Sequence, residues 1–371
     1  MTLRPLDLSK RNHVRAYLAL PARLSGDFPD WLPAPQSLVA ADLSPNHPYY
    51  EHSEAAFFLA GDPLSPTGRI AVLANRNHAA HRHSDAAFFT HFECIDDAAV
   101  AAELFHTAAA WAVEKGMGRL IGPVGFLQSD ARGMMVAGHG RMSSFALPYS
   151  PPYYQALMEG GGFRKHSDYL SGELASDFRL APRVDRVADR LRERSGIRLR
   201  STHSRKTLRR LAPELFAIYK ASGDKAPLYY PTTPAEERLI LQRLAQTACP
   251  PLIHWIEERG VPCGVHMALP NHAEALRRAG SNRLARTAAF LKQRRRPSEI
   301  NIAMTYLKPD HQGRGLNLLL YMACQQAALE LGCRRALVGP VHEENRTGLS
   351  VLEKSGVVFD IVHRLYIKEI P

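Results

Sequence analysis

The chain has 371 residues, of which 45% are hydrophobic and 22% charged. That length is typical of two or three domains, and the composition is that of an ordinary globular protein. Apolar runs fall short of the roughly 18 residues of a membrane span, and the polar N-terminus lacks a signal-peptide core. We therefore expect a cytoplasmic protein with no membrane segment. The five cysteines have no CxxC spacing, which predicts reduced thiols rather than a disulfide framework or a cysteine zinc site.

The net charge of +11 is unevenly distributed. Residues 1–176 contain 14 Lys and Arg against 17 Asp and Glu, which gives a net charge of −3. Residues 177–371 contain the other 33 against 19, which gives +14. This surplus predicts an acidic partner for the second half, namely a nucleotide cofactor, an acidic carrier protein or RNA. The alternative is a basic, solvated face without a partner.

The first half reads as a mixed set of strands and helices. Short β-type runs are separated by the turn-rich segment GDPLSPTG, and a long segment with apolar residues at helical spacing follows them. The expected elements are strands at 56–60, 69–75 and 86–95, a helix at 97–115, a strand at 119–124, a short helix at 152–160 and a strand at 165–174.

The second half repeats this order. A hairpin is expected at 251–258 and 261–269, then a strand at 299–308, a helix at 316–331, a strand at 336–341, a short helix at 344–354 and a strand at 358–368. The motif ALVGPV echoes RLIGPV 217 positions further on. The shared order predicts a duplicated α+β domain, with domains at 1–176 and 211–371 joined by an Arg-rich helical connector at 177–210.

A glycine-rich loop lies between the expected strand at 299–308 and the helix that follows. It reads Gln312-Gly313-Arg314-Gly315-Leu316-Asn317. A helix N-terminus presents free N–H groups and partial positive charge, and glycines let a phosphate approach the backbone closely. The loop therefore predicts a site for a pyrophosphate group.

The loop resembles the Q/R-x-x-G-x-G/A motif of the GNAT (GCN5-related N-acetyltransferase) superfamily, and EENRTGLSVLEKSG resembles the Asn-bearing helix of that superfamily. The likeness is specific over roughly residues 250–368. The first half resembles the same fold, and GPVGF, PYSPPYYQALMEGGGF and KHSDYL are similar to bacterial tandem-GNAT proteins of undefined function. The resemblance implies two tandem domains, each a mixed, mostly antiparallel sheet flanked by helices.

The resemblance also implies how an acyl-coenzyme A, acetyl-CoA or another, binds as co-substrate. The backbone amides of Gln312 to Asn317, including Leu316, bind the pyrophosphate. The backbone of Leu307 pairs with the pantetheine arm, which Asn345 also contacts. Asn317 departs from the family pattern, which has Gly or Ala there, although Asn is accepted at a helix start.

The corresponding loop of the first half reads Glu93-Cys94-Ile95-Asp96-Asp97-Ala98-Ala99. It contains no glycine, and two carboxylates stand where phosphates would bind. Because like charges repel, we expect the first domain not to bind coenzyme A and to support or cover the substrate site instead.

Transfer of an acyl group to an amine needs a base and stabilisation of the oxyanion, and the leaving thiolate can require an acid. In the GNAT superfamily that acid is often a Tyr seven positions after the helix Asn, a position that Leu352 occupies here. The candidates that remain are Tyr306, on the strand beside the thioester site, and His342 and Glu343, which follow a strand. A core role for Tyr306 and a helix-start role for the other two are the alternatives.

Tyr229 and Tyr230 lie where the fold places a substrate-covering loop, and we expect them to line the substrate site, with plain packing as the alternative. His78, His81 and His83 are better explained by a polar hairpin tip than by a metal site, so no metal is expected. The cluster of Arg277, Arg278, Arg283, Arg286 and Arg294 to Arg296 precedes the strand at 299–308.

The sequence thus predicts an acyl-CoA-dependent N-acyltransferase that acts on a small amine in its C-terminal domain. Tandem GNAT folds also occur in transferases that take aminoacyl groups from tRNA, and the basic half suits such a polyanion. An acidic acyl carrier protein is a further alternative donor. A non-catalytic acyl-CoA-binding protein is the third hypothesis, because Leu352 replaces the usual acid.

Overall fold

The computed structural model describes the whole chain except residues 1–2, 142–143, 145–146, 176–195, 225 and 281. The chain divides into two compact units, each built from segments that are not contiguous in the sequence. Unit 1 comprises Met1–Tyr169, Tyr230–Glu237 and Ile361–Pro371, and unit 2 comprises Leu170–Tyr229 and Arg238–Asp360. The division therefore differs from the contiguous ranges that the sequence suggested. Residues 177–195 of the expected connector lie outside the described residues, and the rest of it contains a strand and the start of a helix.

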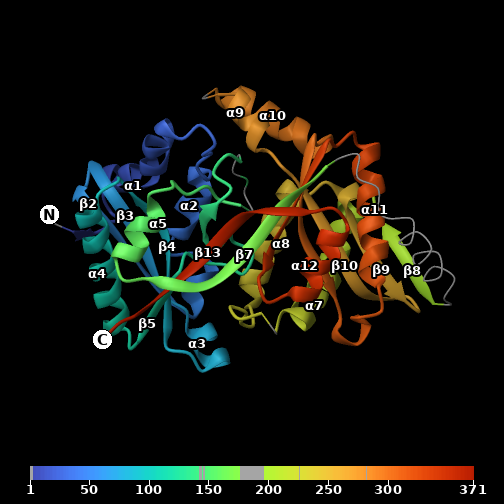
Figure 1. Cartoon of the computed structure of the whole chain (residues 1–371), viewed down its shortest axis with the longest axis horizontal. Helices are drawn as coiled ribbons and strands as arrows, with labels where there is room; N and C mark the ends of the chain where they lie inside the picture. Colours follow the sequence, from blue (N-terminus) through green and yellow to red (C-terminus); the bar gives the residue numbers. More distant parts are fainter. Residues whose placement is uncertain (1–2, 142–143, 145–146, 176–195, 225, 281) are drawn as a thin grey trace. The chain divides into compact units, whose positions relative to one another are not determined.

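Unit 1 is a mixed sheet with helices on both faces (Figure 1). The strands are β1 (Arg4–Pro5), β2 (Glu54–Asp62), β3 (Ser65–Ala74), β4 (Ala86–Cys94), β5 (Arg119–Gly122), β6 (Met134–Ala137), β7 (Arg164–Ala175) and β13 (Val358–Glu369). The helices are α1 (Arg11–Leu24), α2 (Gln36–Asp42), α3 (Arg76–Arg82), α4 (Ala98–Glu114) and α5 (Tyr154–Gly160), with 3-10 turns η1 (Ser25–Asp27) and η2 (Pro48–Glu51). The strand order is β1-β2-β3-β4-β5-β13-β7, with β6 beside β13 and with β4 and β5 parallel.

Alternation along the strands of unit 1 decides which helix each face of the sheet meets. Phe58 and Ile70 pack into a core with the apolar side of α4, where Leu104 is fully buried. Phe57, on the opposite face, contacts the ring of Tyr17 from α1. The sheet is therefore the middle layer of three.

Unit 2 repeats the three layers. Its strands are β8 (Ile197–Ser201), β9 (Ile253–Glu258), β10 (Val261–Pro270), β11 (Glu299–Leu307) and β12 (Arg335–His342). The helices are α7 (Arg205–Gly223), α8 (Pro234–Thr247), α9 (Ala273–Arg278), α10 (Arg283–Arg295), α11 (Leu316–Glu330) and α12 (Arg346–Lys354), with 3-10 turns η3 (Pro250–Leu252) and η4 (Pro309–His311). The order is β7-β12-β11-β10-β9-β8, and β11 and β12 are parallel.

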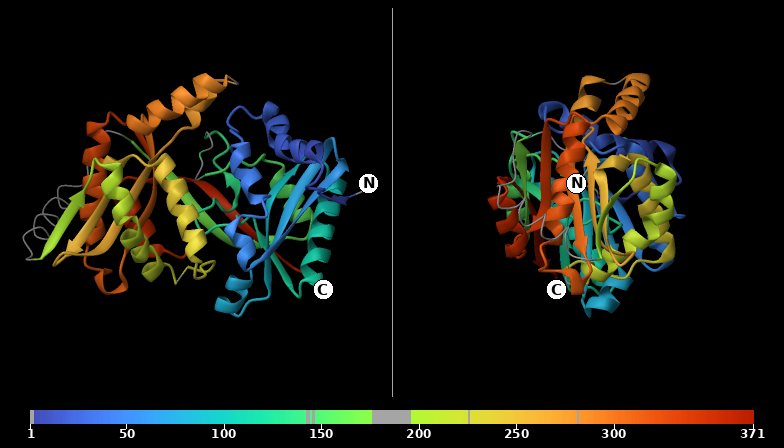
Figure 2. Two further views of the ribbon diagram at one scale, coloured as in Figure 1. Left: turned by 180° about the vertical axis from the view of Figure 1, so that it is seen from behind. Right: turned by 90° about the vertical axis from the view of Figure 1, so that its right-hand side faces the viewer.

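The two faces of the unit 2 sheet pack against different helices (Figure 2). Ile256 and Leu307 pack with the apolar side of α11. Trp255, Val265 and Tyr306 pack with α7 on the opposite face. Neighbouring residues of one strand thus serve different layers, as a period of two requires.

The last strands of the two halves are arranged differently from the sequence prediction, in which each closed its own half. Residues 170–175 of β7 belong to unit 2, where β7 lies beside β12. Conversely, the C-terminal part of β13 belongs to unit 1, where Tyr366 pairs with Gly122 of β5 and Glu369 with Arg119. Each sheet is therefore completed by chain from both halves.

The five cysteines, Cys94, Cys249, Cys263, Cys324 and Cys333, are buried free thiols, which confirms the prediction of reduced cysteines. Within the described part of the chain, no helix combines the length and the apolar character that crossing a membrane requires.

Candidate functional site

The parallel strands β11 and β12 pair at their beginnings and then separate. Pairing runs from Glu299 with Arg335 to Ile302 with Val338, although β11 continues to Leu307 and β12 to His342. The pairing between β10 and β11 also shifts by one residue between Met267 and Ala268, which marks a bulge in the ladder. The second half of β11 therefore has a sheet edge that β12 does not occupy.

The glycine-rich loop connects this strand to the start of α11. Gly313 and Gly315 both have left-handed backbone angles, with φ of 73° and 76°, which glycine adopts without a steric penalty. A Cβ atom at Gly313 would meet no described atom within 4 Å, so the space above the loop is open. Gly315 is the N-cap of α11 and has no side chain to satisfy the first N–H groups of the helix. The loop thus leaves amide groups available to an anion.

Arg314, within the loop, is paired with an acidic side chain. Its guanidinium donates to Oε1 of Glu258 at 2.6 Å, and the other oxygen of Glu258 lies 3.0 Å from Nε2 of His311. Nδ1 of His311 lies 2.7 Å from the carboxylate of Asp310. The hydrogen bond from Arg314 is the main cause that lowers the pKa of Glu258. The loop is therefore held to the end of β9 by an ionic network.

The backbone of Leu307 faces the free edge of β11. The N–H of Lys308 donates to the Cys263 carbonyl at 2.8 Å, and hydrogen bonds alternate along an antiparallel strand. The N–H and C=O groups of Leu307 consequently point away from β10. The carbonyl accepts from the Ser222 hydroxyl at 2.7 Å and from the Gln312 amide at 3.1 Å, so its two lone pairs are engaged. The N–H group of Leu307 faces the edge of β11 that β12 does not occupy.

The two asparagines predicted at the site have different surroundings. Asn345 is the N-cap of α12, and its side-chain oxygen accepts the N–H of Gly348 at 3.0 Å. Asn317 lies in the first turn of α11 and is hydrogen-bonded with Tyr321, whose pKa is raised mainly by burial.

The three candidate catalytic residues come from two places. Tyr306 faces α7, where its ring meets the ring of Tyr219 edge-on with centroids 5.1 Å apart. His342 ends β12, and its Nδ1 accepts the N–H of Glu344 at 3.3 Å. Glu343 follows it and is half-buried. His342 and Glu343 therefore lie at the end of the strand that diverges from β11, whereas Tyr306 points into a different layer.

An apolar pocket lies between α11, α12 and the paired part of β11 and β12. Ile300, Ile302 and Val338 line it from the strands, Ala328 from α11 and Leu352 from α12. Leu352 is thus a pocket-lining residue at the position where the superfamily often has an acid.

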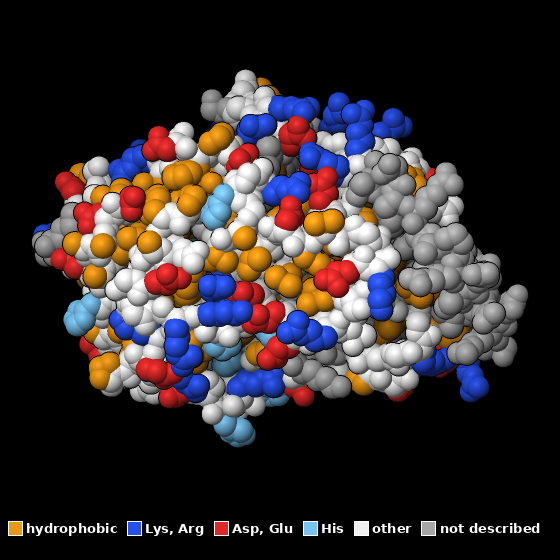
Figure 3. All heavy atoms as spheres, in the orientation of Figure 1, with side chains coloured by type: hydrophobic (Ala, Val, Ile, Leu, Met, Phe, Trp, Pro, Cys, Tyr) orange, Lys and Arg blue, Asp and Glu red, His pale blue; other side chains and the backbone are white. Residues whose placement is uncertain are grey.

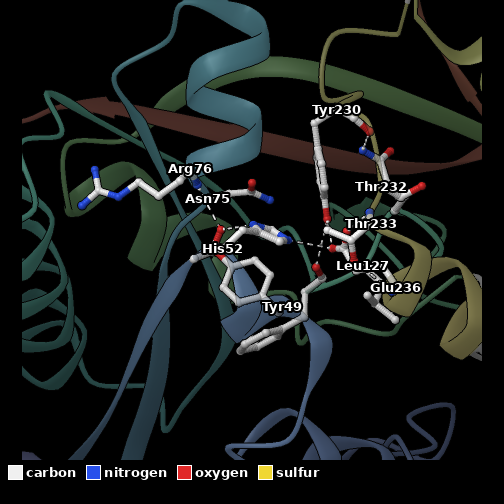
Figure 4. A network of polar contacts seen from close by, with 12 residues as sticks. Tyr49, His52, Asn75, Arg76, Leu127, Tyr230, Thr232, Thr233 and Glu236 are labelled. Atoms are coloured by element: carbon white, nitrogen blue, oxygen red, sulfur yellow. Dashed lines mark hydrogen bonds and ion pairs between the residues drawn. The ribbon is translucent and has the colours of Figure 1, made fainter.

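Tyr229 and Tyr230 are adjacent in sequence but belong to different units. Tyr229 is buried in unit 2, and its ring meets that of Tyr219 with centroids 6.3 Å apart. Tyr230 belongs to a buried polar network in unit 1 (Figure 4), and its hydroxyl donates to Oε1 of Glu236 at 2.8 Å.

The centre of this network is the fully buried carboxylate of Glu236, which the sequence analysis did not single out. Nε2 of His52 lies 3.2 Å from Oε1, and the N–H of Thr233 donates to Oε2 at 2.8 Å. Burial raises the pKa of Glu236, but the hydrogen bonds from His52, Thr233 and Tyr230 outweigh it and leave the pKa lowered. The sequence signal was the capping pattern Thr233-x-x-Glu236, in which the Thr233 hydroxyl also accepts the N–H of Glu236 at 3.2 Å.

Unit 1 has the same strand separation but a different helix start. β4 and β5 pair only as far as Phe88 with Ile121. The helix that follows β4 is capped by Asp97, whose Oδ1 accepts the N–H groups of Ala99 at 2.8 Å and Val100 at 3.3 Å. The carboxylate thus occupies the donors that a phosphate would need, which supports the expectation of a non-binding copy.

The NHAAHRH segment forms a short helix, α3, and not the expected polar hairpin tip: His78 and His81 lie on α3, His83 is its C-cap, and His78 is buried against the ring of Phe88. Among the described residues, no group of three or more His, Cys, Asp or Glu side chains is arranged to hold a metal ion.

Residues 215–357 match the model of the acetyltransferase (GNAT) family, and this range contains β11, the loop, α11 and β12. The fold of the whole chain is similar to that of a tandem GNAT protein from the clavulanic acid biosynthesis pathway, with a TM-score of 0.58, 13% identity and coverage of 99% of this chain and 98% of the other. Residues 215–357 are thus similar to the acetyltransferase (GNAT) family, and the whole chain has the fold of a tandem GNAT protein.

Other relatives are similar to this chain over most of its length. A GCN5-related N-acetyltransferase from Sphaerobacter thermophilus has a TM-score of 0.51 at 15% identity, covering 99% of this chain and 95% of its own. The sequence is 26% identical over 373 residues to the bacterial ceramide synthase of Caulobacter vibrioides (strain NA1000 / CB15N), covering 96% of this chain and 94% of that protein. It is 24% identical over 270 residues to Protein YghO of Escherichia coli (strain K12), covering 72% of this chain and 68% of that protein.

Proposed function

We propose that unit 2 binds an acyl-coenzyme A and transfers its acyl group to an amine. The observation that carries this proposal is the uncapped start of α11, at Gly313 to Gly315, directly after a strand with a free edge. In this arrangement the amides of residues 312–317 hold the pyrophosphate, the Leu307 N–H pairs with pantetheine, and the amide nitrogen of Asn345 contacts the same arm. The apolar and basic character of the surroundings suits an anionic cofactor with an uncharged arm.

The chemistry requires one proton to be removed from the amine. The amine nitrogen attacks the thioester carbonyl, the C–N bond forms, the C–S bond breaks, and the coenzyme thiolate takes up a proton. We assign the removal of the amine proton to His342, with Glu343 beside it. Tyr306 has a packing role in this account, because it faces α7 and Tyr219.

Turnover tests the assignment directly. The purified chain is incubated with acetyl-CoA and an amine panel, thiol release is measured, and the product is identified by mass spectrometry. His342→Asn should lower kcat about 100-fold while leaving the dissociation constant of acyl-CoA unchanged. Glu353→Gln is the matched control, since Glu353 is an exposed acid on α12. Equal turnover of His342→Asn and the wild type would contradict the role of His342.

A second candidate changes the acyl group and the acceptor. The relative named bacterial ceramide synthase is similar over 96% of this chain, and the apolar pocket beside β11 and β12 offers a surface for a hydrocarbon chain. We therefore propose fatty acyl-CoA and a long-chain amino alcohol as the alternative substrates. A series of acyl-CoAs from acetyl to palmitoyl distinguishes the two candidates. Leu352→Trp, which fills the pocket, should shift the preference toward shorter chains only if an acyl chain enters it.

A further inference from the structure

A basic helical hairpin, formed by α9 and α10, is inserted between β10 and β11 of unit 2. It projects from the sheet in Figure 1 and in both views of Figure 2. The first helix is anchored by Ala273 and Leu276, which are buried. Every residue of α10, by contrast, is exposed or half-buried. The second helix therefore lies on the surface of the unit.

The side of α10 that faces the protein is largely polar. The Arg286 guanidinium donates to the carbonyls of Leu276 at 3.4 Å and Gly280 at 3.1 Å. Arg294 donates to the Gln246 carbonyl at 3.2 Å. Phe290 is the apolar contact of this side, and its ring stacks on His272 with centroids 4.4 Å apart.

The side that faces solvent carries an apolar stripe. Leu284 is 83% exposed and Leu291 is 40% exposed, and Ala288 between them is exposed as well. Their spacing of four and three residues places them on one stripe of the helix. An amphipathic helix of a globular protein normally turns such a stripe to the core, so α10 has the opposite orientation.

The stripe is surrounded by positive charge. Residues 271–298 contain eight Lys and Arg and one acid, a net charge of +7, which is half the surplus of the second half. The one acid, Glu274, forms an ion pair with Arg278. Arg295 continues the stripe, and Lys292 and Arg296 beside it are exposed. Lys and Arg side chains gather over this hairpin along the upper edge of Figure 3.

We propose that this face of α10 binds an anionic lipid surface. Leu284 and Leu291 enter the boundary between headgroups and acyl chains, and Lys292, Arg295 and Arg296 meet the lipid phosphates. A nucleic acid fits less well, because its recognition draws on phosphate contacts and aromatic stacking, whereas the outward stripe consists of aliphatic residues. The projecting hairpin presents a convex face, which suits a planar surface better than the groove or patch of a small acidic protein. The inference is independent of which amine the enzyme acylates.

Sedimentation of the full-length chain with lipid vesicles tests this proposal. The protein should bind vesicles that contain phosphatidylglycerol, should not bind pure phosphatidylcholine vesicles, and should dissociate as salt is raised. The double variant Leu284→Glu/Leu291→Glu should weaken binding at least about tenfold. Leu64→Glu is the matched control, because Leu64 is 63% exposed on a turn of unit 1, far from the hairpin in sequence; it should bind like the wild type.

A second readout separates docking from a general loss of structure. Leu284→Trp should show a blue shift of its fluorescence with anionic vesicles and none with neutral ones. The stabilisation of the double variant by acyl-CoA should equal that of the wild type, because neither leucine belongs to the coenzyme site. Equal vesicle binding by the double variant and the wild type would overturn the proposal. So would a chain that ignores vesicles but binds an acyl carrier protein or RNA through the same leucines.

Discussion

The helices α4 and α11 start at the same point of two similar units, yet their first turns have opposite chemistry. In unit 1 the carboxylate of Asp97 accepts the N–H groups of Ala99 and Val100, so the helix start is satisfied from within the chain. In unit 2 the start is Gly315, which has no side chain, and Gly313 leaves open space above the loop. One carboxylate at an N-cap thus distinguishes a helix start whose first N–H groups are satisfied by a side chain from one whose N-cap has no side chain.

The same contrast extends to the polar groups around each unit. The carboxylate of Glu236 in unit 1 is fully buried and its oxygens are taken by His52, Tyr230 and Thr233. The carboxylate of Glu258 in unit 2 is half-exposed and is shared by Arg314 and His311 at the edge of the loop. In unit 1 the charge of Glu236 stabilises the interior of the fold, whereas in unit 2 the charge of Glu258 lies at a solvent-accessible surface.

Removing the buried carboxylate of unit 1 should have the largest effect. Glu236→Ala leaves His52, the Tyr230 hydroxyl and the Thr233 N–H without their acceptor, which should cost about 3 kcal/mol in the free energy of unfolding. Urea denaturation followed by circular dichroism measures it, with Glu237→Ala as the neighbouring control. The dissociation constant of acyl-CoA should be unchanged. A selective loss of coenzyme binding, with stability intact, would instead make Glu236 a ligand-site residue and break the contrast.

Acid should destabilise unit 2 before unit 1. Burial lowers the pKa of three histidines of unit 2, His254 to about 4, His266 to about 3 and His272 to about 4, whereas in unit 1 it lowers the pKa of His363 to about 4. Because these pKa values are depressed, the contribution of each neutral imidazole to the stability of the native state is complete above pH 6.5. This contribution is lost as the pH falls from 6.5 to the pKa of the folded state. Each histidine should therefore cost about 2 kcal/mol between pH 7 and pH 5.

His254 offers a test of this pH dependence. Neither ring nitrogen has a hydrogen-bond partner among the described residues, so His254→Leu removes a titrating group without breaking a bond. The variant should match or exceed the wild type at pH 7 and lose less stability at pH 5. Denaturant midpoints at the two pH values measure the difference. An unchanged pH dependence would show that His254 is not a buried neutral imidazole.

A smaller effect is expected at the loop of unit 2. Glu258→Gln removes a negative charge beside the proposed pyrophosphate site and releases Arg314, so acyl-CoA should bind several-fold more tightly. Glu257→Gln is the control, because Glu257 is the next residue of β9 and pairs with Arg200 on the opposite side. Titration calorimetry at low salt measures both. Weaker binding by Glu258→Gln would mean that the ionic network favours acyl-CoA binding by ordering the loop, and that this effect exceeds the repulsion between the Glu258 carboxylate and the ligand.

The sequence predicts the local elements of this fold well, because their signals are local. The helix at 316–331 and the strand at 299–308 are observed as Leu316–Glu330 and Glu299–Leu307. The exchange of β7 and β13 could not be predicted, since alternation identifies a strand but not its neighbour. The pair of His52 and Glu236 joins residues far apart in the chain, and the half-buried ion pair of Arg314 with Glu258 joins the glycine-rich loop to the end of β9. Such pairings depend on the tertiary fold and leave no periodic signal.

For the candidate site, the sequence predicted the backbone features of the loop but not the surroundings of the side chains. The role of the loop glycines can be predicted from the sequence, because glycine adopts backbone angles that other residues rarely adopt. Both glycines have left-handed backbone angles in the structure. The side-chain assignments of Tyr306 and Tyr230 required knowing which face each residue meets. The first faces α7, and the second joins the network of unit 1.

Calorimetric titration with acyl-CoA tests whether the uncapped start of α11, and not the start of α4, binds the coenzyme. We expect one acyl-CoA binding site per chain, which Gly313→Glu should abolish and Gly332→Glu should retain. Both glycines have positive φ, 73° and 80°, with open space around a Cβ, and they flank the two ends of the same helix. Asp97→Gly should leave the stoichiometry at one. Two sites per chain, or equal affinity in Gly313→Glu and Gly332→Glu, would contradict the account.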